Sequence, residues 1–161
     1  MAESRILRVL RAAPTRGPAV RRASLLIPRT IALGVALALA VDAFVHATNS
    51  GFYDPTQPGI FTEGNLFRAE ALVSGVVALL VLVHPSRWTF AGALLVAASA
   101  VGAVVLYRYV DVGAIGPFPN LYEPTWDAPG KLPSAYAEGI AVLLSAAGAA
   151  MTRARRQSRQ A

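Results

Sequence analysis

The sequence contains no cysteine, two histidines and a single lysine. Without cysteine, disulfides, thiolate metal sites and cysteine nucleophiles are all excluded. Glycine-rich phosphate loops and the G-x-S-x-G nucleophile motif are also missing. The two histidines, His46 and His84, fall on opposite faces of the predicted membrane domain, so they cannot ligate one haem iron. These absences remove most common catalytic chemistries, and we predict no cofactor.

Charge is also scarce, at 15% of the 161 residues, whereas 55% are hydrophobic. The apolar residues are concentrated in four blocks, and residues 88–107 carry no charge at all. A run of that length matches the ~20 residues that a helix needs to cross the ~30 Å hydrocarbon core of a bilayer. We therefore predict an all-α transmembrane four-helix bundle with up-down-up-down topology. The four-span membrane domain covers 28–152, with spans at about 28–48, 66–84, 88–110 and 134–152.

Arginine placement predicts the orientation of this bundle. Twelve of the fifteen cationic residues lie in a basic, disordered arm (1–27), at Arg29 directly after it, in a basic tail (153–161) or in the turn at Arg87. By the positive-inside rule these segments are cytoplasmic, so we expect both termini in the cytoplasm and the domain in the plasma membrane. The proline-rich loop at about 111–133 is then extracytoplasmic, and we expect it to cap the bundle. One alternative is cleavage of a twin-arginine-like signal near 38–40, which would leave three spans.

Small residues recur every four positions in each span and predict the faces along which the helices pack. Lipid gives no hydrophobic drive between helices, so close approach at small residues supplies much of the association energy. The predicted packing faces are Gly34–Ala38–Asp42–His46, Glu70–Ser74–Ala78, Ala98–Gly102 with Ser99–Ala103, and Ala141–Ser145–Ala149.

Ionisable residues enter all four spans at a similar depth, near the predicted outer face. An isolated charge in a bilayer costs several kcal/mol, so such groups are expected to face one another or a hydrated pocket. Three hypotheses remain open: a structural network in which Arg108 bridges carboxylates, a small-molecule or proton site, and a metal site built from His46 with Asp42, Glu70 or Glu138. The candidate site residues are Asp42, His46, Glu70, Arg108, Asp111 and Glu138.

Two segments carry a resemblance to other proteins. Glu63-Gly-Asn-Leu-Phe-Arg-Ala-Glu70 and Leu106-Tyr-Arg-Tyr-Val-Asp-Val-Gly-Ala-Ile-Gly-Pro-Phe-Pro-Asn-Leu-Tyr-Glu-Pro-Thr-Trp126 are similar to segments of small uncharacterised four-helix membrane proteins of high-GC actinobacteria. The resemblance covers roughly residues 30–150 and implies the same four-span fold. It implies no known activity.

The leading functional hypothesis is a non-catalytic accessory or interaction subunit with a polar cluster in the outer leaflet. The alternative is a small carrier or proton- or ligand-binding membrane protein that uses the carboxyl groups inside the spans. The third hypothesis is a metal-dependent membrane enzyme. The expected partners are the lipid bilayer and another membrane protein or a second copy of the chain. Nucleic acid is not expected, because topology alone explains arginines that flank a span.

Overall fold

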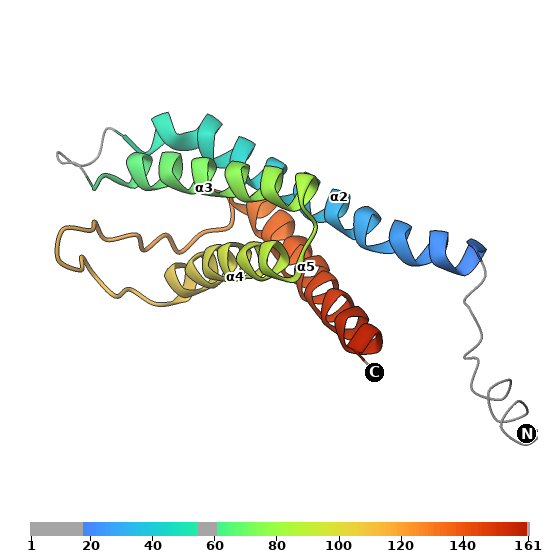
Figure 1. Ribbon diagram of the computed structural model, residues 1–161. Coiled ribbons are helices and arrows are strands. Elements are labelled where there is room, and N and C mark those ends of the chain that lie inside the picture. The colour runs from blue at the N-terminus through green and yellow to red at the C-terminus, as the bar shows by residue number, and fades with distance from the viewer. Residues whose placement is uncertain (1–17, 55–60, 161) are drawn as a thin grey trace, which may run out of the picture.

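The computed structural model describes residues 18–54 and 61–160, and this part of the chain is all-α (Figure 1). It consists of four long helices and one turn of 3₁₀-helix joined by non-helical connections, with no strand in the described segments. The elements are α2 (Pro18–Asn49), η1 (Ser50–Phe52), α3 (Glu63–Val83), α4 (Arg87–Tyr109) and α5 (Lys131–Gln160).

All four long helices are long and apolar enough to cross a membrane. The stretches that qualify are Pro28–Phe52, Glu63–Val83, Arg87–Tyr109 and Lys131–Ala154. They agree with the four predicted spans to within a few residues at each end. Their outer surfaces carry large apolar side chains, such as Leu72, Leu95 and Leu143, that are about 70% exposed. Because water-exposed apolar surface on this scale is unusual, the helices fit a membrane-embedded protein.

Two helices extend beyond the predicted spans. α2 begins at Pro18 and α5 continues to Gln160, so residues 18–27 of the predicted disordered arm and 153–160 of the predicted tail are helical. Arginine is a good helix former and does not end a helix. Pro28 lies inside α2, where it removes one backbone hydrogen bond without ending the helix. Residues 1–17 of the predicted arm lie outside the described residues.

The ends of the central helices are capped by side chains. Thr62 Oγ1 accepts a hydrogen bond from the backbone of Asn65 at 3.1 Å, which satisfies one free amide at the start of α3. Ser86 and Thr89 form a reciprocal capping box at the start of α4. This box makes the connection between α3 and α4 a short, defined turn.

The helices pack around α2, which contacts both α3 and α5, while α4 packs mainly on α5. The apolar core lies nearer the end that holds the Ser86 turn. The end of α2, the start of α3 and the 110–130 connection gather at the other end (Figure 1). The largest core side chain is Phe90, which is fully buried against α5. Fully or almost fully buried core residues are Ala32, Val35, Leu39, Val81, Phe90, Ala93, Ala97 and Ala141.

Three of the four predicted packing faces agree with the burial pattern. Ala38, Ser74, Ala78, Ala141 and Ser145 are all buried between helices. The face predicted for the third span is wrong, since Ala98, Ser99, Gly102 and Ala103 are exposed. α4 instead turns Phe90, Ala93 and Ala97 inward. An alanine-rich helix has several faces lined by small residues, so spacing alone does not show which face is buried. In α4 the bulky ring of Phe90 decides which face turns inward.

The 110–130 connection is non-helical and is attached to the bundle at defined points. Glu123 donates its backbone N–H to the carbonyl of Tyr107, in the last turn of α4, at 3.0 Å. Ile115 and Phe118 exchange backbone hydrogen bonds around a tight turn, and Gly116 within it has a φ of 58°. That left-handed conformation favours glycine. The connection therefore holds Glu123 beside the helix ends.

Candidate functional site

Three helices each contribute two polar side chains that lie one helical turn apart. Side chains four positions apart share one face of a helix, so each pair points in a single direction. The three pairs meet inside the bundle. We call these six residues the polar cluster: Asp42 and His46 of α2, Glu70 and Ser74 of α3, and Ser134 and Glu138 of α5.

Asp42 lies at the centre of the polar cluster and is 1% exposed. Ser74 Oγ lies 2.8 Å from its Oδ2, and Ser134 Oγ lies 2.9 Å from its Oδ1. His46 Nδ1, on the same helix, lies 3.0 Å from Oδ1. One carboxyl group therefore connects α2 to both of the helices that pack on it.

Each serine also reaches a second carboxyl group. Ser74 Oγ is 3.1 Å from Glu70 Oε1, and Ser134 Oγ is 2.7 Å from Glu138 Oε1. A hydroxyl has one hydrogen, so a serine that donates to one carboxyl group can only accept from the other. Each serine-bridged pair therefore needs one carboxyl proton to complete both hydrogen bonds. The alternative is a bound cation that balances the charge of the ionised pair.

One oxygen of the polar cluster has no hydrogen-bond donor within the described residues. Glu138 is 0% exposed, and its Oε2 makes no hydrogen bond within the described residues. Buried polar atoms are nearly always paired, so an unpaired one calls for an explanation such as a proton, a water molecule or an ion. The Glu138 carboxyl group is thus satisfied on one oxygen only.

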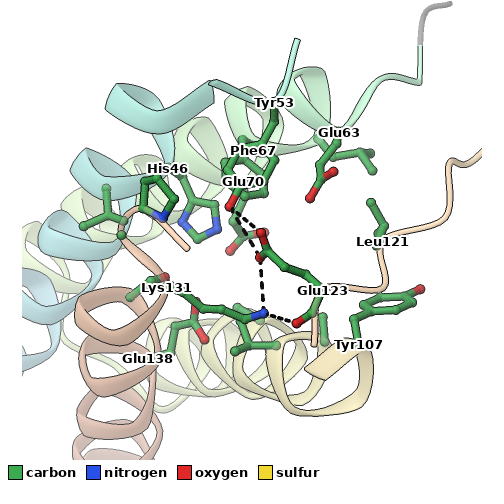
Figure 2. A pocket seen from close by; sticks show the side chains of 18 residues that line it. His46, Tyr53, Glu63, Phe67, Glu70, Tyr107, Leu121, Glu123, Lys131 and Glu138 are labelled. Carbon is green, nitrogen blue, oxygen red and sulfur yellow. Dashed lines mark hydrogen bonds and ion pairs between the residues drawn. The ribbon is translucent and has the colours of Figure 1, made fainter. Parts of the chain in front are cut away.

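A cavity of about 200 Å³ adjoins the polar cluster (Figure 2). His46, Glu70, Ser134 and Glu138 line its inner end. The measured space is many times the ~10–15 Å³ that one water requires. Much of the remaining wall is apolar, and it is formed by Val45, Leu66, Phe67, Ala100, Ala103, Val104, Leu121 and Pro129. The cavity can therefore hold water or a small ligand against the carboxyl groups.

The cavity is also lined by a second polar group, which we call the rim group: Tyr53, Glu123 and Lys131 (Figure 2). Lys131 Nζ donates to the Glu123 backbone carbonyl at 2.6 Å and to Glu123 Oε2 at 3.2 Å. The Tyr53 hydroxyl donates to Glu123 Oε1 at 3.3 Å. Burial, and then the negative charge of Glu123, raise the pKa of the Tyr53 phenol, so it remains a hydrogen-bond donor.

The cavity has an excess of acidic groups. Glu63, Glu70, Glu123 and Glu138 line it, and Lys131, the one lysine or arginine among its lining residues, is already paired with Glu123. Among the residues that the structure describes, no lysine or arginine lies within 4.0 Å of a carboxylate of the polar cluster. Buried carboxylates without a cationic partner are strongly destabilising. Protons or a bound cation must supply the balance.

Two of the six predicted site residues lie apart from this arrangement. The Arg108 guanidinium lies over the rings of Tyr109 and Trp126, at 5.0 and 5.8 Å from their centroids, and its buried Nε has no partner in the described chain. Asp111 accepts hydrogen bonds from Gly113 N and Asn120 Nδ2. The predicted bridge between Arg108 and the carboxylates is therefore absent from the described residues. The other four candidates, Asp42, His46, Glu70 and Glu138, come together.

Sequence reasoning missed the rim group and the bridging role of the two serines. A signal existed for the serines, because Ser74 and Ser134 each lie four positions from a glutamate on the same helix. No such signal existed for the rim. Tyr53 and Glu123 are 70 positions apart, and they meet through the path of the 110–130 connection.

Comparison with known proteins adds no analogy to this geometry. No protein-family model matches the chain, and no match is found among curated proteins or among solved structures. The resemblance to actinobacterial four-helix membrane proteins therefore stays a prediction. Function must be argued from the cavity itself.

Proposed function

We propose that this protein is a multi-pass membrane protein that binds a small cation in the acidic cavity between its helices. The observation that carries this proposal is the set of carboxyl groups in the polar cluster, which has no lysine or arginine partner in the described part of the chain. A cation bound there would balance charge that the fold leaves unbalanced, in a medium where such charge is costly.

The membrane arrangement completes the proposal. We infer that the four helices cross a bacterial plasma membrane in alternating directions, with both termini in the cytoplasm. Arginines are concentrated at the chain ends and at Arg87, and the α3–α4 turn lies at the opposite end of the bundle from the 110–130 connection (Figure 1). The cavity and the proline-rich connection then face the extracytoplasmic side, from which the cation enters.

The competing proposal is an accessory subunit in which the polar cluster serves only to hold the helices together. It is supported by the serines, which connect α2 to α3 and to α5 at buried positions. It gives no role to the cavity beside the cluster or to the unpaired oxygen of Glu138. For that reason we favour cation binding. A metal-dependent enzyme would need a substrate-binding feature that nothing in the cavity identifies.

A binding experiment separates these two proposals. The protein is reconstituted in nanodiscs and titrated by calorimetry with sodium, potassium, methylammonium, magnesium, calcium, manganese and zinc ions. We expect saturable binding of at least one cation, and its loss in Glu138→Gln. Asp127→Asn provides the control, because Asp127 is an exposed carboxylate outside the cavity. If no cation in the series binds, and Glu138→Gln merely stabilises the fold, cation binding is rejected and the accessory role is favoured.

A further inference from the structure

We propose that the cation is a divalent transition-metal ion held by the imidazole of His46 and the carboxylates of Asp42 and Glu138. This inference rests on the proposed function and names its ligand class. It also names three ligating residues from two helices, α2 and α5. Glu70 and the rim group lie outside this set.

The positions of the donor atoms support the assignment. One donor atom from each of Asp42, His46 and Glu138 lies within 4.8 Å of the other two. Metal bonds to imidazole and carboxylate are ~2.0–2.2 Å long, so neighbouring ligands sit about 3–3.5 Å apart. The 3.0 Å between His46 Nδ1 and Asp42 Oδ1 already has that value. The donor atom of Glu138 lies within 4.8 Å of both, so coordination requires a small movement of the Glu138 side chain toward this pair.

A second and independent observation is the unpaired oxygen of Glu138. Its Oε2 is buried without a hydrogen-bond donor, although Oε1 is bonded to Ser134. A metal ion supplies the missing partner. Ser134 and Ser74 meanwhile hold Asp42 by both of its oxygens. Ligands in metal sites are commonly oriented by hydrogen bonds of this kind from residues behind them.

The donor set selects among metals. One nitrogen and two carboxylate ligands suit zinc, manganese or ferrous iron, whereas magnesium and calcium prefer oxygen ligands alone. The two ligating carboxylates and a neutral imidazole balance a divalent charge, whereas a monovalent ion would leave one negative charge of this ligand set unbalanced. Three protein ligands also leave a coordination position open. His46 and Glu138 both line the cavity, so that position is accessible to water or a small ligand.

Cobalt provides a direct probe, because Co²⁺ replaces such metals and its visible absorption reports its ligands. The untagged protein in nanodiscs is stripped with a chelator and titrated with Co²⁺, and zinc is then added in competition. We expect one Co²⁺ per chain, displaced by zinc and not by magnesium or calcium. His46→Gln and Glu138→Gln should each lower affinity at least 100-fold, and Ser134→Ala roughly 10- to 100-fold. Asp127→Asn tests a carboxylate outside the cavity and should retain the cobalt spectrum.

The outcomes distinguish the two proposals. Binding of methylammonium or sodium without any cobalt or zinc site would overturn the metal assignment and leave cation binding standing. Absence of binding by every cation would overturn both. A cobalt spectrum that is the same in His46→Gln would also overturn the assignment. His46 is partly exposed and its hydrogen bonds in the described chain go to Asp42, so this variant should fold. Thermal unfolding of each variant verifies that it does.

Discussion

The two ends of the helix bundle are built on different principles. Toward the Ser86 turn, the helices meet through small apolar residues and the fully buried ring of Phe90. Toward the 110–130 connection, they meet through carboxyl groups, serines and a cavity. Both ends contain a buried oxygen without a hydrogen-bond partner in the described chain, Ser145 Oγ and Glu138 Oε2, but only Glu138 lines a cavity. The comparison indicates that the apolar end maintains the fold and leaves the polar end free to bind.

Truncation at the apolar end should have the largest effect on stability. A Cβ at Gly148 would lie 2.6 Å from ring carbons of Phe90, which shows how closely the ring and α5 approach. Phe90→Ala should leave a cavity and lower the free energy of unfolding by about 3–5 kcal/mol. Gly148→Leu should destabilise by about 1–3 kcal/mol through overpacking.

Reversible unfolding in mixed detergent measures both effects. Leu95→Ala is the matched control, since Leu95 is 72% exposed on the same helix as Phe90. Equal losses in Phe90→Ala and Leu95→Ala would contradict the assignment of stability to this end.

At the polar end, Asp42→Asn should change stability little and weaken cation binding. Replacing a buried charge by a neutral isostere is often neutral or stabilising, and the asparagine amide can still bond to Ser74 and Ser134. We expect the free energy of unfolding to change by less than about 1 kcal/mol, while cation affinity falls at least tenfold. Calorimetric titration and unfolding of the same sample give both values. A large loss of stability with unchanged affinity would show that the polar end, too, is structural.

The meeting of four candidate site residues could be predicted from the sequence. The position of a residue along a helix gives both the face on which its side chain lies and its depth in the membrane. Asp42 and His46 share a face by spacing alone, and Glu70 and Glu138 fall at the same level of neighbouring spans. The rotation of α4 could not be predicted in the same way. Its several small-residue stripes are equivalent until Phe90 is packed against α5, and that rotation also decides where Arg108 points.

The rim group could not be predicted from the sequence, because its residues meet only through the path of the 110–130 connection. Lys131 and Glu123 are close in sequence, but nothing in their spacing indicates that the 110–130 connection folds back over the cavity. The hydrogen bond from Glu123 N to the end of α4 fixes that path. Contacts of this kind depend on loop closure, which has no periodic signature.

Lys131→Gln changes the charge of the cavity and leaves the proposed ligands unchanged. The glutamine can still donate to the Glu123 carbonyl, but the cavity loses its one lysine. Cation affinity should rise by about 1 kcal/mol, or roughly fivefold, the scale of one unit charge acting through a partly solvated medium. Titration at low and high salt checks the electrostatic origin, because screening should reduce the gain. Lower affinity in this variant would contradict an attractive role for the acidic groups.

The smallest effect is expected from the exposed ion pair at the same end. Arg68 binds both carboxylate oxygens of Asp54 and lowers the pKa of Asp54 below 3.8, its ordinary value. A lowered pKa stabilises the fold fully above pH 3.8, and this contribution is lost as the pH falls through the folded-state pKa. The unfolding free energies of wild type and Asp54→Asn should therefore differ slightly at pH 6 and converge in acid, at low salt. A difference that grows on acidification would contradict a stabilising role for the Arg68–Asp54 ion pair.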